Sequence, residues 1–260
     1  MIILLHSSKT MRSSDSVVSG LRAPQLLDKA TTLARYLKTL SAPQLARHMH
    51  LSAALAAKTH ALIADWSPAP QKQSVALDSF VGDIYSGLRA DSLSPDDRAY
   101  ADETLRILSG LYGSIRPLDG ICPYRLEMGY VLPDPTYKNL YTFWGTAIAE
   151  ALPDAGVIVN VSSLEYTKAV LPYVDPARVV TPKFMTIDPK TGRPVFVVVH
   201  AKIARGAFAR WLIVTRATDT TDLTAFHDIG YAYDPALSSP AEPVFVCREF
   251  GGKGLSMRLQ

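Results

Sequence analysis

The sequence predicts a single mixed α/β domain that spans residues 1–260. Three observations support this fold class. Short apolar runs typical of buried strands alternate with longer segments of helical periodicity. The chain has no internal repeat, low-complexity segment or long linker, and its 260 residues can form one large core. A mixed α/β domain is the economical interpretation of this pattern.

The N-terminal quarter is expected to hold one strand and a group of helices. Ile2–His6 is an apolar run that ends in the polar segment 7–10, as in a buried strand that carries a binding loop at its carboxyl edge. Residues 24–64 show helical periodicity that breaks near 41–43 and 51–52, which predicts two or three helices. A proline-rich loop is expected to follow.

A further helix is expected to begin at Ser94-Pro95-Asp96-Asp97. Serine is a favoured N-cap, proline suits the first helical position, and the acids face the positive end of the helix dipole. This helix should run to about Leu108 and end at Ser109-Gly110. The later expected elements are helices over 140–152 and 164–171, and strands over 157–160, 178–187, 194–200 and 243–247.

A stretch without acidic residues runs from Lys190 to Thr218, and its residues 201–211 are expected to form an amphipathic helix. At about 100° per residue, cations share one arc of roughly 140° and apolar side chains share another. The cations are Lys202, Arg205, Arg210 and Arg216, and the apolar residues are Ile203, Ala207, Trp211 and Val214. Either acids from elsewhere in the fold neutralise this basic face, or it attracts an anionic ligand.

Composition and motifs exclude several classes of protein. A net charge of +3 is mild, so nucleic-acid binding would need clustered charge. No apolar run reaches the roughly 20 residues of a membrane helix, and no signal-peptide core is present, so we expect a cytoplasmic protein without a membrane partner. Cys122, Cys247 and the histidines lack metal-binding spacing, and P-loop and Rossmann fingerprints are missing. We therefore predict no metal and no cofactor.

Three segments carry groups suited to an anionic ligand. Gly110 and Gly113 suit a tight turn whose amides approach a phosphate, although any helix that ends in glycine gives a similar string. Arg125 and Glu127, two apart on an extended segment, either form a structural ion pair or line a pocket. Polar residues also follow the strand expected over 157–160, where a helix begins; they include Asn160, two candidate N-cap serines, Glu165 and Lys168.

Strings spread over nearly the whole chain share the order and spacing of one known family. They are residues 80–88, 108–113 with Arg116-Pro117-Leu118-Asp119, 123–129 (Pro-Tyr-Arg-Leu-Glu-Met-Gly), 139–145, 160–166 with Lys168, 201–206 (Ala-Lys-Ile-Ala-Arg-Gly) and Gly230-Tyr231. In these strings the chain resembles the YaaA peroxide-stress protein family. The resemblance implies a single compact α/β domain with a helix-hairpin-helix-like element at Gly110 to Gly113 and a basic cleft lined by Lys202 and Arg205.

The same resemblance implies a function. It indicates binding to duplex DNA with little sequence preference and a cytoplasmic role in limiting iron-dependent peroxide damage. Two segments differ from the family pattern. The first loop reads His6-Ser7-Ser8-Lys9-Thr10 where the family typically has Ser-Pro-Ala-Lys-Thr, and Ile203 replaces the second of two adjacent lysines. These differences would fit a paralogue that takes a different ligand.

Two functions are therefore predicted for one cleft. A DNA-binding or other anion-binding site would use Lys9, Gly110, Gly113, Arg116, Arg125, Asn160, Lys168, Lys202, Arg205, Arg210 and Tyr231. An enzyme would use Lys9, Glu127 and Glu165 on a small anionic or nucleotide-like substrate, because a phosphate clamp has no use for glutamates. A groove lined only by cations favours DNA, and a closed pocket that holds both glutamates favours catalysis. A non-catalytic partner of an acidic protein is a third hypothesis.

One pairing is not expected. Ser7 beside His6 looks like a nucleophile with its base, but neighbours on a strand point to opposite faces.

Overall fold

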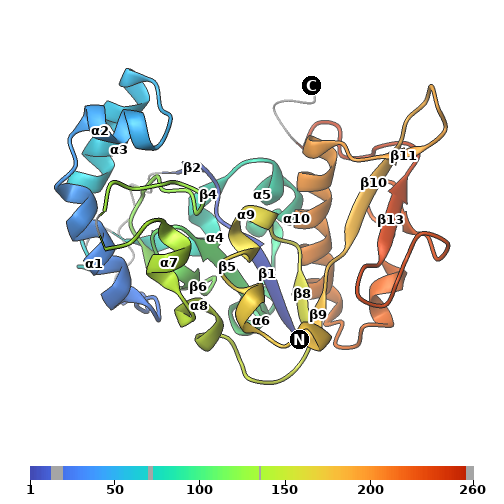
Figure 1. The fold of residues 1–260 in the computed structure, drawn as a ribbon. Helices are drawn as coiled ribbons and strands as arrows, with labels where there is room; N and C mark the ends of the chain where they lie inside the picture. Colours follow the sequence, from blue (N-terminus) through green and yellow to red (C-terminus); the bar gives the residue numbers. More distant parts are fainter. Residues whose placement is uncertain (13–19, 70–72, 135, 256–260) are drawn as a thin grey trace.

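The computed structural model of the protein describes residues 1–12, 20–69, 73–134 and 136–255. Two sheets lie on either side of one long helix, α10 (Val198–Thr215) (Figure 1). In spatial order, the larger sheet consists of β6 (Gly113–Ile115), β5 (Leu105–Ser109), β1 (Ile2–His6), β8 (Ile158–Asn160) and β9 (Val179–Val180). The smaller sheet consists of β11 (Pro194–Val195), β10 (Lys183–Ile187), β13 (Val244–Cys247) and β12 (Tyr231–Tyr233).

Strand β1 is the centre of the larger sheet. It runs parallel to β5 and to β8, with Leu4 paired to Arg106 on one side and to Asn160 on the other. All of its residues are buried, as expected for an apolar run inside a parallel sheet. Because parallel strands end at the same edge, the polar loops that follow β1 and β8 emerge side by side. The strands predicted over 2–6 and 157–160 are confirmed.

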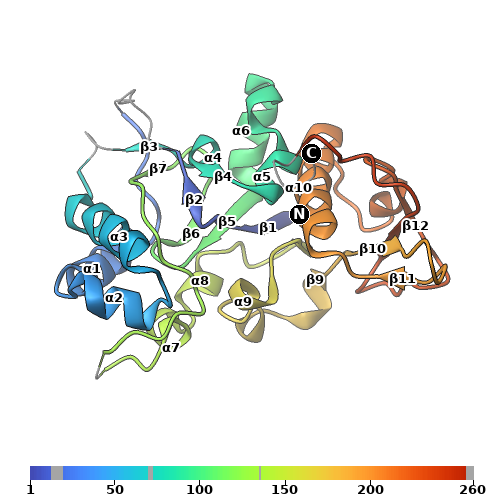
Figure 2. The same cartoon turned by 90° about the horizontal axis from the view of Figure 1, so that it is seen from above.

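The predicted N-terminal helices are also confirmed. They are α1 (Leu27–Lys38), α2 (Ala42–His48) and α3 (Ala53–Asp65), and they lie at the end of the molecule opposite the smaller sheet (Figures 1 and 2). Serine side chains start two of them: Ser41 forms a capping box with Gln44, and Ser52 accepts a hydrogen bond from the Leu55 N–H (3.3 Å). These caps explain why the helical periodicity breaks at both serines.

The helix that begins after Ser94 is shorter than predicted. Ser94 accepts a hydrogen bond from the Asp97 N–H (3.1 Å), but α6 (Pro95–Thr104) ends before the apolar run 105–109. That run forms β5, whose residues are all buried between β1 and β6. Gly110 therefore follows a strand, and Gly113 pairs with Ser109 in an antiparallel β-hairpin. The expected helix-hairpin-helix element is not formed at these glycines.

Two other predicted elements are divided. The helix expected over 140–152 becomes α7 (Leu140–Trp144) and α8 (Ala147–Glu150), separated by Gly145 with a φ of 52°. The strand expected over 194–200 stops after Val195, because α10 already begins at Val198. The strands expected over 178–187 and 243–247 are present as β9, β10 and β13.

Smaller elements connect these parts. They are the ladders β2 (Thr10–Met11) with β4 (Phe80–Val81) and β3 (Ser74–Val75) with β7 (Gly120–Ile121), the helices α4 (Ala76–Ser79), α5 (Asp83–Leu88) and α9 (Leu164–Thr167), and 3₁₀ turns at Ala90–Ser92, Leu171–Tyr173, Pro176–Arg178 and Asp222–Ala225. Together the elements form a single mixed α/β domain, as predicted. Among the helices of the described ranges, none has both the length and the apolarity needed to cross a membrane.

Helix α10 is buried on most of its sides because it packs between the two sheets (Figure 1). Ile203 and Ala207 are buried as predicted, but Val214 is 46% exposed, so the apolar arc does not continue to the end of the helix. On one side α10 meets α5 at glycines: a side chain on Gly206 would collide with the Ile84 carbonyl, and one on Gly87 with the Ile203 carbonyl. This backbone contact fixes α10 beside the loop region that follows β1.

Candidate functional site

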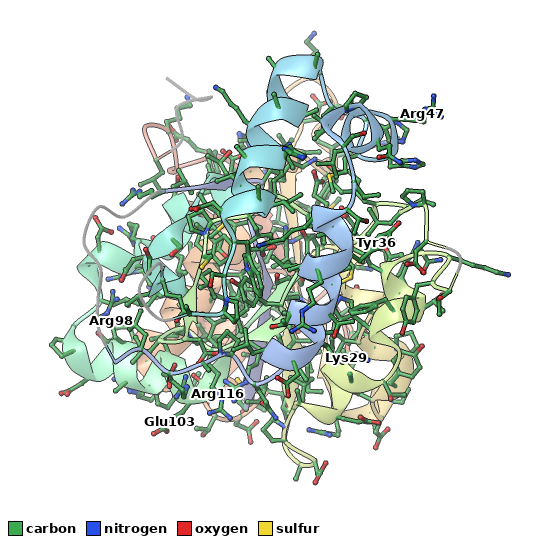
Figure 3. All side chains as sticks on the ribbon, turned by 90° about the vertical axis from the view of Figure 1, so that its left-hand side faces the viewer. Lys29, Tyr36, Arg47, Arg98, Glu103 and Arg116 are labelled. Carbon is green, nitrogen blue, oxygen red and sulfur yellow. The ribbon has the colours of Figure 1, made fainter. Side chains whose placement is uncertain are left out.

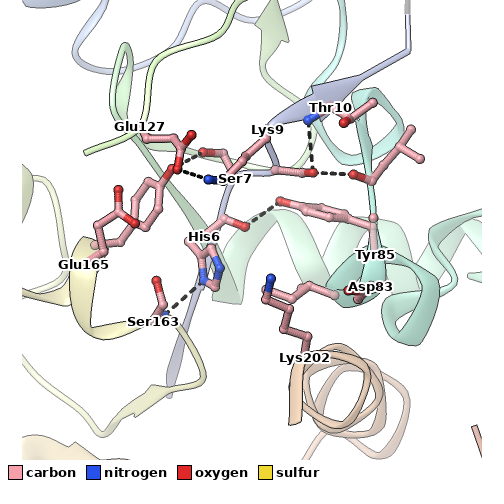
Figure 4. A pocket seen from close by; sticks show the side chains of 15 residues that line it. His6, Ser7, Lys9, Thr10, Asp83, Tyr85, Glu127, Ser163, Glu165 and Lys202 are labelled. Atoms are coloured by element: carbon pink, nitrogen blue, oxygen red, sulfur yellow. Dashed lines mark hydrogen bonds and ion pairs between the residues drawn. The ribbon is translucent and has the colours of Figure 1, made fainter. Parts of the chain in front are cut away.

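A cavity of about 510 Å³ lies at the carboxyl edge of the larger sheet (Figure 4). Its walls come from the loop after β1, the start of α5, the segment that carries Glu127, helix α9 and helix α10. The acidic, basic and imidazole side chains that line it are His6, Lys9, Asp83, Glu127, Glu165 and Lys202. Its volume lies within the roughly 300–1,000 Å³ of small-molecule pockets. The edge beyond the carboxyl ends of parallel strands is a common place for such a pocket.

Lys9 and Glu127 form a close ion pair in this cavity, with 2.6 Å between Nζ and Oε2. The Lys9 side chain is 63% exposed and that of Glu127 only 9%. The Tyr130 hydroxyl donates to the other Glu127 oxygen (2.5 Å). Arg125 lies 3.9 Å from that same oxygen, and its guanidinium donates to the Lys9 carbonyl (3.1 Å). Arg125 and Glu127 thus form a loose pair, and only Glu127 lines the cavity.

Glu165 is held in place from the main chain. Its Oε1 accepts the Gly129 N–H (2.8 Å), and its carbonyl oxygen accepts the Tyr141 hydroxyl (2.9 Å). Gly129 suits this contact, since a Cβ there would lie 3.1 Å from Glu165 Oε1. Within the described ranges of the chain, Oε2 of Glu165 has no hydrogen-bond or ion-pair partner. The carboxylate is fixed but retains one oxygen for a ligand.

His6 presents a fixed protonation state at the floor of the cavity. Its Nδ1 accepts the Ser163 N–H (3.0 Å), and its ring stacks on Tyr166 with centroids 5.1 Å apart. Burial lowers the pKa of His6 to about 3, and the positive charges of Arg205 and Lys202 contribute to this shift. The imidazole is therefore neutral near pH 7, and because Nδ1 is an acceptor, the proton lies on Nε2.

Two cations of α10 stand close to His6. Lys202 lines the cavity, and Arg205, one turn further along the helix, is near enough for its charge to act on His6. Burial lowers the pKa of Arg205. Neither cation forms an ion pair with any residue in the described part of the chain. Asp83 from α5 lies beside Lys202 (Figure 4).

The other cations of the predicted basic face are engaged elsewhere. Arg210 donates to the carbonyl of Arg89 (3.2 Å). Arg216 pairs with Asp97 (2.8 Å) and lies over the ring of Tyr100. Only the N-terminal part of the basic face therefore belongs to the cavity.

Several further residues that the sequence singled out lie outside the cavity. The buried Asn160 side chain accepts the Ser162 N–H (3.1 Å) and donates to Thr181 (3.2 Å), so it braces the loop after β8. Lys168 is exposed at the end of α9. The Arg116 main chain donates to Asp119 (2.8 Å), and Figure 3 places Arg116 on the face that also carries Glu103.

Gly110, Gly113 and Tyr231 have roles in packing. A Cβ on Gly110 would lie 2.5 Å from the Leu126 carbonyl oxygen, and one on Gly113 would lie 2.8 Å from the Trp144 ring. Both glycines are buried, so their amides do not face a solvent-borne phosphate. Tyr231 is buried among the aromatic side chains between α10 and the smaller sheet, where its hydroxyl lies 3.3 Å from Thr186 Oγ1.

The structure also adds residues that sequence reasoning missed. His6 and Ser7 both line the cavity, because β1 ends at His6 and the alternation of a strand no longer applies beyond it. Ser7 contacts the Tyr166 hydroxyl (3.4 Å) instead of the His6 ring. The position of His6 at the end of a buried strand was the signal available in the sequence. Among the described residues, no group of three or more His, Cys, Asp or Glu side chains is placed to hold a metal ion.

The fold and the cavity define an α/β protein with a polar pocket of small-molecule size at the edge of its larger sheet. The family described as "Peroxide stress protein YaaA" matches residues 1–237 of the chain. A protein from Salinispora tropica described as "UPF0246 protein" is 60% identical over 258 residues, which cover 99% of this chain and 98% of that protein. The chain belongs to the YaaA family.

Proposed function

We propose that this protein acts in the cytoplasm in the response to peroxide stress, as an enzyme that binds and transforms a small anionic molecule in the cavity. The observation that carries the proposal is the convergence of Lys9, Glu127 and Glu165 with His6 and Lys202 in one cavity. Membership in the peroxide-stress family supports the biological role. Three carboxylates in the lining support a small molecule over DNA, because they would repel the phosphates of a duplex.

The arrangement suits proton transfer. Glu165 has one fixed oxygen and one available oxygen, which makes it the candidate general acid or base. Glu127 holds the Lys9 ammonium group in position. Lys202 and the Nε2–H of His6 are placed to stabilise negative charge that develops on the substrate. We therefore assign proton transfer to Glu165 and electrostatic stabilisation to Lys202 and His6.

Survival in hydrogen peroxide tests this proposal in a host strain that lacks its own family member. Glu165→Gln should reduce survival to that of the strain without the protein, since loss of a general acid or base costs roughly 10²–10⁴ in rate. Lys202→Met should do the same, because it removes the cation that stabilises negative charge on the substrate. Lys168→Met is the matched control, because this exposed lysine ends the helix that carries Glu165 but lies outside the cavity. Full protection by a folded Glu165→Gln variant would contradict the proposal.

Duplex DNA is the second candidate ligand. The observation in its favour is that Lys9 is 63% exposed at the cavity and that Lys168 is exposed at the end of α9. If DNA lies across this region, combining Lys202→Glu with Lys168→Glu should abolish gel retardation of a duplex, and binding should weaken steeply with salt. Glu165→Gln should leave retardation intact. If the double variant retards the duplex as strongly as the unmodified protein does, this surface is excluded as a DNA site.

A further inference from the structure

We propose that the small molecule whose anionic group binds in the cavity also carries an ammonium group and is therefore a zwitterion. Its anionic group would lie beside Lys202 and the Nε2–H of His6, and its ammonium group would lie at Glu165. This inference rests on the proposed function, because it names the class of molecule that the same cavity accepts. It follows from which charges in the cavity already have partners and which do not.

Lys9 and Glu127 satisfy each other. Their 2.6 Å ion pair neutralises both charges, and Tyr130 and Arg125 complete the surroundings of the Glu127 carboxylate. Both Glu127 oxygens are engaged, so this carboxylate has little capacity left for a ligand. The charged groups that remain for the ligand are on the other walls.

Glu165 is the acidic group that lacks a counter-charge. Its Oε1 accepts a single main-chain N–H, and no cation of the described residues lies within ion-pair distance of it. A partly buried carboxylate gains most from a charged hydrogen-bond donor. A ligand ammonium group supplies both the charge and the hydrogen bonds.

The opposite wall carries excess positive charge. The charges of Lys202 and Arg205 both lower the pKa of His6, and within the described residues neither cation has an ion-pair partner, although Asp83 lies beside Lys202. His6 adds a neutral N–H donor at the same place. A ligand carboxylate or another compact anion would meet a lysine, a nearby arginine and a fixed donor there.

These two sites belong to one ligand because they face the same space. In Figure 4, Glu165 lies on one side of His6 and Lys202 lies on the other. A molecule that satisfies both needs an amine at one end and an anion at the other. A nucleic-acid backbone has only the anion.

A series of ω-amino acids from glycine to 6-aminohexanoate tests this inference, because its members differ in the separation between the ammonium group and the carboxylate. Each is compared with the carboxylate and the amine of the same chain length, and binding is followed from ¹H–¹⁵N signals of the full protein. At least one amino acid should bind about tenfold more tightly than its matched carboxylate, the gain expected from about 1.4 kcal/mol. Glu165→Gln should remove that gain and leave carboxylate binding unchanged, whereas Lys202→Met should weaken both.

The inference is overturned if no amino acid exceeds its matched carboxylate by more than about twofold, or if the gain survives in Glu165→Gln. Lys168→Met is the control and should bind like the unmodified protein. The survival assay separates this failure from failure of the proposed function. The proposed function stands and the zwitterion inference fails if Glu165→Gln loses peroxide protection while the unmodified protein shows no preference for a zwitterion.

Discussion

His6 shows how the surroundings of one residue can fix its chemistry. Its ring accepts the Ser163 N–H and stacks on Tyr166, and its carbonyl accepts the Tyr85 hydroxyl. The ring is a hydrogen-bond donor whose protonation does not change near neutral pH. Such a donor binds an anion equally well over that range, unlike an exposed histidine.

The depressed pKa of His6 makes stability dependent on pH. Because the folded value is about 3 and the unfolded value 6.5, the unfolded chain binds more protons between them, so the stabilising contribution is lost as pH falls through that window. This group alone should cost about 2 kcal/mol of unfolding free energy between pH 7 and pH 5. Urea unfolding at both values measures the loss.

His6→Asn should remove that part of the pH dependence, because the Asn oxygen can still accept the Ser163 N–H but does not titrate. A ¹⁵N signal of the His6 ring that titrates with a midpoint near 6.5 in the folded protein would disprove the assignment.

At the scale of elements, the contact between α5 and α10 determines the position of Lys202 in the wall of the cavity. Gly87 and Gly206 let the two backbones touch, and this contact brings Lys202 to the cavity beside Asp83. Glycine inside a helix is unfavourable by roughly 1 kcal/mol relative to alanine. Close packing of the two helices is the physical reason why glycine stands there.

Gly206→Ala should therefore destabilise the protein although alanine is the better helix former. The added methyl group meets the Ile84 carbonyl, so the helices must separate, at an expected cost of about 1–3 kcal/mol. Urea unfolding measures this loss, and ligand affinity should fall with it because Lys202 moves. Ser86→Ala on α5 is the control. An alanine variant as stable as the unmodified protein would show that the helices do not touch as described.

The boundary between α6 and β5 shows what local sequence can and cannot predict. The start of α6 was predictable because Ser94 and Pro95 act within the chain itself. Its end was not, because an apolar run such as 105–109 suits a buried helix and a buried strand equally well. Pairing with β1 and β6, which are distant or later in the chain, decides for the strand. The error then placed Gly110 after a helix instead of after a strand.

At the scale of the whole molecule, the same limit applies to the site. Lys9 was predictable as a site residue because it follows a buried strand, and Lys202 because it belongs to a basic helix. Arg210 and Arg216 share that basic face. However, Arg210 donates to a main-chain carbonyl of another segment, and Arg216 forms an ion pair with Asp97. Which cations remain for a ligand depends on residues that the fold brings from elsewhere, and helical spacing does not report them.

The burial of the two cysteines limits how they can react with peroxide. Cys122 and Cys247 are both buried thiols, and burial raises the pKa of the Cys247 thiol. Peroxide reacts with exposed thiols of low pKa. Protection should therefore not depend on thiol oxidation, and a protein with Cys122→Ala and Cys247→Ala should sustain the same survival in hydrogen peroxide.

Alkylation by iodoacetamide, followed by mass spectrometry, tests the premise directly. Native protein should stay unlabelled at both cysteines over minutes, and protein in concentrated urea should be labelled completely, because only unfolding exposes the sulfur atoms. The Glu165→Gln variant provides the contrast in the survival assay, since it should lose protection with both thiols intact. Loss of protection in the stable double alanine variant would instead place a thiol in the protective chemistry and move that chemistry out of the cavity.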